Sequence, residues 1–287
     1  NIDLRSFFSF FKIYFKSNNH FNNWRKKNVI FIKHHLMHAS LAVYSSSFRE
    51  CAYINADGGG DLGDERHFVF GEFKNNKFRD LINYPGKASI ASFHGYVSDA
   101  LGMSGGENGK TSGLAAYGEV NSELKNKFNE IVKIKKLNIE FKRTRKKNSN
   151  MNFSKLKAQE YDRAKIIHSY PGMTNVFQIS KKYLPQDIAA TAESIVVEKF
   201  LEILNKVRIM TNKKNVVFSG GLFSNVGLNN KIIESKIFQN VHFNFAPSDV
   251  GLSLGGALYL HNKKNSLKRI SNLSPYLGPS FHNKEIE

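Results

Sequence analysis

Residues 28–61 read NVIFIKHHLMHASLAVYSSSFRECAYINADGGGD, and the rest of the chain is interpreted around this stretch. Its first apolar run, residues 29–32, predicts a short buried strand. A helix-like apolar pattern then covers residues 34–44, and a second strand is predicted over residues 51–56. The first predicted strand leads into a histidine pair and the second into an Asp-Gly loop. This adjacency favours a functional site where the two strands end.

His34 and His38 are four residues apart on the predicted helix, so their imidazoles project from one face. Two imidazoles at that spacing can hold one metal ion, whereas His35 points elsewhere. The loop that begins Asp57-Gly58 lets the backbone approach a phosphate or an ion and places a carboxylate at the rim. Histidine pairs without further ligands are more often surface or capping residues, and glycine runs are usually turns, so both interpretations stay open.

Length and composition exclude several classes of protein. The 287 residues suffice for one large domain or two lobes, and 41% hydrophobic residues fit a globular protein. No apolar run reaches the roughly 18 residues of a membrane span. The Phe-rich residues 1–27 predict an amphipathic helix rather than a signal peptide. A single cysteine, Cys51, excludes an internal disulfide and favours a reducing cytoplasm, with core packing as its role.

The formal net charge is +18, and half of this excess lies in one segment. Residues 123–166 hold 14 Lys and Arg against 5 Asp and Glu, a net charge of +9. Such a segment can bind nucleic acid or a phosphate ligand. Because the chain is rich in Asn, Ile and Lys throughout, general composition is the better explanation, and nucleic-acid binding is not expected. Residues 121–180 are interpreted as a basic surface insertion.

The other segments alternate between predicted strands and helices. Residues 67–84 predict a hairpin with Asn75 and Asn76 at its turn. A helical pattern over residues 89–103 ends at a glycine-rich segment, residues 102–118, which predicts a functional or tightly packed loop with Lys110 as its cation.

In the second half, Pro185, Gln186 and Asp187 begin a long predicted helix. A strand at residues 216–218 ends in Gly-Gly and opens a helix. This is a phosphate-binding geometry, although such glycines often serve only close packing. A last strand, residues 241–245, leads to Asp249 at a helix start, where it is either an N-cap or a ligand of a metal or nucleotide.

Taken in order, six motifs resemble the N-terminal domain of the carbamoyltransferase family that makes O-carbamoylated natural products and nodulation factors. They are HHLMHASLAVYSSSF, the strand with its DGGGD loop, GENGKTSGLAAYG, DIAATAE, SGGLFSN and PSDVGLSLGGAL. The resemblance implies an α/β, two-lobed actin/Hsp70-like ATPase fold of the ribonuclease H-like kind. Because no motif of the family is found before residue 28, this fold is expected to be incomplete, with a basic insertion.

The resemblance also implies a division of the chain. An N-terminal-like domain covers residues 1–272, with lobe one at 28–120 and lobe two at 181–265, on either side of the basic insertion. Residues 273–287, which include SPYLGPSF, are then a linker towards an absent C-terminal YrdC-like domain.

Site residues are implied in the same way. The family holds a metal, usually iron, through the two histidines of an HxxxH helix and through aspartates, and it binds nucleotide through glycine-rich loops. Imidazole and carboxylate ligands are compatible with iron or zinc. The matching metal ligands are His34, His38, Asp57 and Asp249, and the matching nucleotide contacts are Gly58, Gly59, Lys110, Gly220, Gly221 and Asn225. No catalytic residue is assigned.

The implied chemistry has two steps. A YrdC-like domain makes carbamoyl-adenylate from carbamoyl phosphate and ATP, and the N-terminal domain transfers the carbamoyl group to a hydroxyl of a small-molecule or sugar acceptor. A metal suits the second step because a Lewis acid stabilises charge on the oxygens of the intermediate. A fragment, or one subunit of a split enzyme with a separately encoded YrdC-like partner, is therefore expected, in the cytoplasm and away from membranes.

Two alternatives remain open. The chain could be a non-catalytic remnant that binds nucleotide or metal. It could also be a relative of the ATPase that makes threonylcarbamoyladenosine in tRNA, which the charge favours and the DGGGD and GLAAYG segments disfavour.

Overall fold

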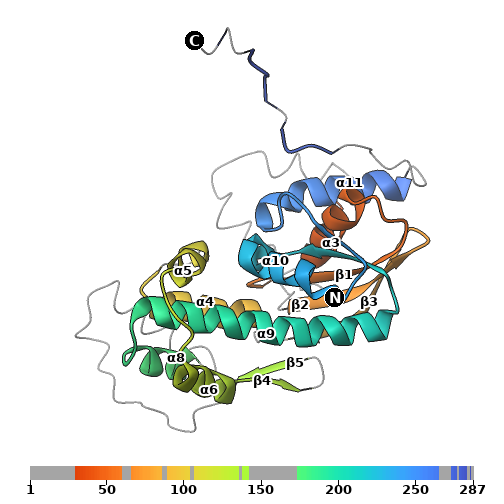
Figure 1. The fold of residues 1–287 in the computed structure, drawn as a ribbon. Helices are drawn as coiled ribbons and strands as arrows, with labels where there is room; N and C mark the ends of the chain where they lie inside the picture. Colours follow the sequence, from red (N-terminus) through yellow and green to blue (C-terminus); the bar gives the residue numbers. More distant parts are fainter. Residues whose placement is uncertain are drawn as a thin grey trace, which may run out of the picture.

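The computed structural model describes residues 30–59, 66–85, 89–103, 107–135, 138–141, 173–264, 273–276, 278–282 and 285. These residues form a five-stranded mixed sheet with helices on both faces (Figure 1). The helix predicted for residues 1–27 lies outside the described residues, as do residues 142–172 of the basic segment.

Five strands make the main sheet, in the order β3-β2-β1-β6-β7. Strand β2 runs antiparallel to β1 and β3, whereas β6 is parallel to both β1 and β7. A separate hairpin of β4 and β5 forms a second sheet. The strands are β1 Cys51–Ala56, β2 Arg66–Lys74, β3 Lys77–Pro85, β4 Val132–Lys135, β5 Asn138–Phe141, β6 Asn215–Ser219 and β7 Asn240–Phe243.

Helices α3 and α11 lie on one face of the sheet, and α4 and α9 lie on the other (Figure 1). The α-helices are α3 His34–Ser45, α4 Ile90–Ala100, α5 Asn108–Ala115, α6 Ser122–Ile131, α8 Met173–Ser180, α9 Pro185–Thr211, α10 Val226–Ser235 and α11 Leu252–Lys264. Two short 3₁₀ helices, η2 Gly221–Ser224 and η3 Asp249–Gly251, follow β6 and β7.

Strand β1 is buried along its whole length because both of its faces are covered. Its alternate residues Ala52, Ile54 and Ala56 join the core that α4, α6 and α9 cover, whereas Cys51 and Tyr53 join the core beneath α3. This is the period-2 pattern of a strand at the centre of a three-layer fold. The predicted core position of Cys51 is confirmed.

The hairpin and the long helix agree with their sequence patterns. Asn75 and Asn76 have positive φ angles of 52° and 57°, which the tight turn between β2 and β3 requires. Helix α9 begins with Pro185 at its first turn and ends at Asn212 in the left-handed conformation. Its 27 residues span about 40 Å, enough to cross the sheet.

The strand predicted for residues 29–32 is wrong over the part that the structure describes. Residues 30–33 have no regular secondary structure, and Ile30 and Phe31 are each 55% exposed. A strand needs a hydrogen-bonding neighbour, and no described strand pairs with this run. The glycine-rich segment also differs from a loop, since α5 occupies Asn108–Ala115 and is anchored by the buried Thr111.

The two lobes predicted at residues 28–120 and 181–265 both contribute strands to the main sheet. Strand β1 belongs to the first range and β6 to the second, yet they are hydrogen-bonded neighbours in one sheet. Helix α6, at the start of the predicted insertion, buries Leu124 and Phe128 in the core that α9 shares. The outer domain limits stay predictions. Within the described ranges, no helix is long and apolar enough to cross a membrane.

A candidate metal centre beside a cleft

Four side chains meet where β1 and β7 end. His34 and His38 come from the first turns of α3, Asp57 follows β1 directly, and Asp249 begins η3 after β7. One ligand atom from each residue lies within 4.8 Å of all the others. The structure therefore brings together all four metal ligands that the sequence predicted.

The spacing of these atoms matches the edges of a coordination polyhedron. His38 Nε2 lies 3.2 Å from His34 Nε2, 2.9 Å from Asp57 Oδ2 and 3.3 Å from Asp249 Oδ1. His34 Nε2 lies 3.5 Å from Asp249 Oδ1 and 3.7 Å from Asp57 Oδ2. Bonds of about 2.1 Å to a metal place adjacent ligands about 3.0 Å apart in an octahedral site and about 3.4 Å apart in a tetrahedral one. One metal ion fits the four atoms.

Burial and charge at this cluster favour a bound cation. His34 and His38 are buried, and the side chain of Asp57 is 14% exposed. Burial raises the pKa of Asp57, but interactions with His34 and His38 and the Gly58 N–H outweigh it, so the pKa lies well below its usual range. Burial and the neighbouring charge of Asp57 raise the pKa of Asp249. Two mutually repelling carboxylates beside two imidazole nitrogens are the donors expected of a metal centre.

Asp57 carries the clearest sign of a ligand. Its Oδ2 atom is buried and, among the described residues, has no hydrogen bond of normal geometry, although His38 Nε2 is near. The other oxygen, Oδ1, accepts a hydrogen bond of 2.7 Å from the Gly58 N–H. One carboxylate oxygen is therefore held by the loop and the other is directed at the histidines.

Surrounding residues fix the elements that carry the ligands. Asn55 on β1 donates from Nδ2 to the backbone carbonyl of His35 at 2.7 Å and accepts a hydrogen bond from the Ser219 hydroxyl on β6. A Cβ at Gly251 would collide with the backbone of Ala246, and a Cβ at Gly255 would collide with the backbone of Met37. These two glycines let η3 and α11 pack closely against α3, which is how Asp249 reaches the histidines.

A cleft of about 1240 Å³ opens beside the cluster, with Asp57 and Gly58 in its lining. Of the predicted nucleotide contacts, Gly58, Gly221 and Asn225 line this cleft. A Cβ at Gly221 would lie 3.2 Å from Asp57 Oδ1, so the Gly-Gly loop after β6 borders the four-residue cluster.

The other predicted nucleotide contacts, Gly59, Lys110 and Gly220, do not line this cleft. Gly59 is next to His67. Lys110 has a 64% exposed side chain and forms an ion pair with Glu107 at the start of α5. Gly220 has a φ of +98°, and a Cβ there would collide with the backbone of Ala56, so close packing of the loop against β1 explains this glycine.

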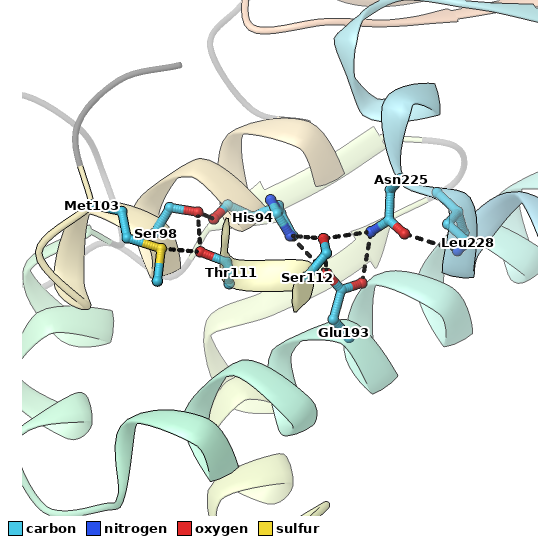
Figure 2. Close-up of polar contacts among 8 residues, drawn as sticks. All are labelled: His94, Ser98, Met103, Thr111, Ser112, Glu193, Asn225 and Leu228. Atoms are coloured by element: carbon cyan, nitrogen blue, oxygen red, sulfur yellow. Dashed lines mark hydrogen bonds and ion pairs between the residues drawn. The ribbon is translucent and has the colours of Figure 1, made fainter. Parts of the chain in front are cut away.

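A second polar cluster lines the cleft, and sequence reasoning missed it. Glu193 on α9 contacts His94 on α4, Ser112 on α5 and Asn225 at the N-cap of α10 (Figure 2). The helix at 89–103 and the DIAATAE motif were identified from the sequence, but no functional residue was assigned in either. The signal that was available is a carboxylate at position 193 inside the apolar stripe of a long helix.

The family model "Carbamoyltransferase N-terminus" matches residues 2–258, which includes the region before residue 28 where no motif was found. The uncharacterized protein MJ1058 of Methanocaldococcus jannaschii is 27% identical over 282 residues, covering 91% of this chain and 42% of that protein. Nodulation protein NolNO of Sinorhizobium fredii is 23% identical over 261 residues, covering 88% of this chain and 34% of that protein. The chain thus spans less than half the length of these relatives.

Among solved structures, full-length HypF in its phosphate- and nucleotide-bound form aligns with a TM-score of 0.45 and 16% sequence identity. The alignment covers 82% of this chain and 43% of HypF.

Proposed function

Because this chain belongs to the carbamoyltransferase family, whose N-terminal model matches residues 2–258, we propose that it carries the site for carbamoyl transfer to a hydroxyl group. The carbamoyl donor is carbamoyl-adenylate, and the acceptor is a small molecule or sugar in a biosynthetic pathway. The chain supplies the transfer site, and a YrdC-like domain supplies the adenylate.

The observation that carries this proposal is the convergence of His34, His38, Asp57 and Asp249 at metal-ligand spacing. Two imidazoles and two carboxylates suit a divalent transition metal, and the family resemblance favours iron. When bound, the metal supplies a Lewis acid that stabilises negative charge on the oxygens of the intermediate.

The chain's own residues then orient the reactants. The cleft beside Asp57 takes the adenylate, with the backbone of Gly58 and Gly221 close to its phosphate because neither residue has a side chain to hold it away. Asn55 holds the α3 backbone at His35, which keeps His34 and His38 in place. The oxygen of the acceptor hydroxyl bonds to the carbamoyl carbon, the bond between that carbon and the phosphate oxygen breaks, AMP leaves, and the hydroxyl proton passes to solvent.

A ribonuclease H-like fold, of the kind found in actin/Hsp70-like ATPases, is part of the proposal. Its support is the sheet, in which an antiparallel β1-β2-β3 meander is extended on the other side of β1 by the parallel strands β6 and β7. Ligands of such open α/β sheets bind at the carboxyl ends of the parallel strands. Asp57, Gly221 and Asp249 all follow carboxyl ends of these strands.

The test is product formation. The purified chain is incubated with Fe²⁺, carbamoyl phosphate, ATP, a YrdC-like domain and a panel of sugars, and carbamoylated sugar is sought by mass spectrometry. We expect product with the wild-type chain and a loss of at least tenfold with Asp249→Asn, in line with the effect of disturbing a metal site. Equal product from both proteins would refute a role for the metal centre, and adenylate that accumulates without any carbamoylated sugar would favour the non-catalytic alternative.

A further inference from the structure

Glu193 is the centre of a polar network that joins four helices around the cleft (Figure 2). Its Oε1 atom lies 2.9 Å from His94 Nε2 and accepts a hydrogen bond of 2.6 Å from the Ser112 hydroxyl. Its Oε2 atom accepts a hydrogen bond of 2.8 Å from Asn225 Nδ2. Asn225 Nδ2 also lies 3.2 Å from Ser112 Oγ, and Asn225 Oδ1 caps α10 by accepting from the Leu228 N–H at 3.0 Å.

The network leaves acceptor capacity on Glu193 and little donor capacity around it. A carboxylate offers about four lone-pair positions. Three donors of the described chain contact Glu193, so about one position is left. The amide of Asn225 is committed to Glu193, Ser112 and its helix cap. Oε2, which takes one donor against two on Oε1, is therefore the atom that can accept a further hydrogen bond.

This carboxylate is ionised and reaches the cleft. Burial raises the pKa of Glu193, but His94, Ser112 and Asn225 together lower it below its usual value. The side chain is 17% exposed, and Glu193 lines the same cleft as Asp57 and Gly58. An ionised acceptor in a partly buried cleft attracts hydroxyl donors and repels phosphate and carboxylate groups.

The wall next to Glu193 leaves room for a ring. Gly109 and Gly113 on α5 line the cleft, and a Cβ added at either would meet no described atom within 4 Å. Ala91 and Ala190 add small apolar surface to the same lining. A polar acceptor beside small apolar residues can contact both the hydroxyl edge and the apolar face of a sugar ring.

We propose that Glu193 forms a hydroxyl-binding subsite for a sugar ring in this cleft, with His94, Ser112 and Asn225 as positioning residues. The ring is either the ribose of the nucleotide or the acceptor sugar, and both would donate a hydroxyl to Oε2. This inference rests on the proposed function for the identity of its ligand, because the cleft leads from Glu193 to the metal ligand Asp57.

The test compares ligands that differ only in hydroxyl groups. Affinities for ATP and 2′,3′-dideoxyATP, and for N-acetylglucosamine, are measured by calorimetry or ligand-observed NMR on the metal-loaded chain. The variant is Glu193→Gln. Its matched control is Glu202→Gln, the same change on an exposed ion-paired residue of α9.

A hydrogen bond to a charged acceptor predicts that the wild-type chain prefers ATP over the dideoxy analogue by about 10- to 100-fold. Glu193→Gln reduces that preference to near unity, and Glu202→Gln leaves it unchanged. This result assigns the ribose. If instead both proteins bind the two nucleotides equally, and N-acetylglucosamine binds the wild type but not Glu193→Gln, the subsite takes the acceptor.

A purely structural role would weaken all ligands in parallel and leave their ratios unchanged, and that outcome would overturn the inference. Wild-type chain that shows neither nucleotide discrimination nor sugar binding would overturn it as well, whether or not Glu193→Gln folds. Metal content and carbamoyl product are measured on the same preparations. A loss of hydroxyl discrimination with metal content retained therefore stands apart from a failure of the proposed function.

Discussion

Asp249→Asn is the sharpest test of the metal centre because this ligand can be changed without disturbing the core. The side chain of Asp249 is 68% exposed, whereas His38 is only 1% exposed. Removing the His38 imidazole would leave a cavity and a buried carboxylate without its partner, so any loss of metal would be confounded by unfolding. Asparagine keeps the shape of Asp249 and removes its charge.

The effect on the metal-free protein and the effect on metal binding have different signs. The charge of Asp57 raises the pKa of Asp249, so the two carboxylates repel one another. Removing one charge should leave the metal-free stability within about 0.5 kcal/mol of the wild type, or slightly higher. Mutating a residue that only supports a metal ligand weakens metal binding by about 10- to 100-fold. Losing one of the four ligands themselves should therefore weaken it by about 100-fold.

The size of the thermal shift follows from these affinities. With metal at 100 times its dissociation constant, binding stabilises the wild type by about 2.7 kcal/mol, and a 100-fold weaker site retains about 0.4 kcal/mol. At about 2–4 °C per kcal/mol, the metal-induced rise in Tm falls from about 5–11 °C to about 1–2 °C.

The assay is differential scanning fluorimetry with and without Fe²⁺ or Zn²⁺, together with elemental analysis of the purified proteins. Glu119→Gln is the charge-matched control, since Glu119 is exposed and outside the four-ligand cluster. An Asp249→Asn protein with wild-type metal content and a wild-type thermal shift would show that the four residues do not hold a metal.

Three further predictions test the packing, the polar network and the basic segment. Gly255→Ala should lower both stability and metal content, because its Cβ would collide with the Met37 backbone. Its control is Gly95→Ala, whose Cβ meets no described atom within 4 Å and which should stabilise α4 by about 0.5–1 kcal/mol in urea unfolding. Glu193 has a folded pKa below its ordinary 4.5, so its stabilisation is present above that pH and is lost as the pH falls through the folded pKa. The stability difference between wild type and Glu193→Gln should therefore be constant from pH 7 to about 5 and shrink at lower pH in unfolding titrations, and a difference that persists at full size in acid would contradict the assigned ionisation. The basic segment is not expected to bind RNA specifically. In a tRNA-binding assay of the wild type and a variant that lacks residues 142–147, binding that survives physiological salt and disappears with the deletion would show that the segment is an RNA site.

The four-residue candidate metal cluster could be predicted because its members lie at the ends of regular elements. His34 and His38 share a helical face at four-residue spacing, Asp57 directly follows β1, and Asp249 begins η3. The family resemblance supplied the step that spacing could not, which is the pairing of Asp57 with Asp249. What the structure added is the close packing at Gly251 and Gly255 that makes the pairing physically attainable.

Errors arose where an element's partner lies far away in the sequence. The apolar run at residues 29–32 satisfies the composition of a strand, but no described strand pairs with residues 30–33. The pairing of β1 with β6, in which Ala52 lies opposite Val216, leaves no trace in local periodicity and was not predicted. The contact between His94 and Glu193 spans 99 residues, so the network around Glu193 was equally invisible.

The metal cluster and the Glu193 network favour ligand groups of different charge at two places in the cleft. Near Asp57, two carboxylates and two imidazoles create a place for a cation, which in turn tolerates a phosphate or carbonyl oxygen. At Glu193, an ionised carboxylate favours hydrogen-bond donors and disfavours anionic groups. A ligand with an anionic end and a hydroxylated ring would therefore be oriented in one direction along the cleft, with its reactive end at the metal. If reversing the charge at Glu193 with lysine improved nucleotide binding while folding was retained, this division of the cleft would be wrong.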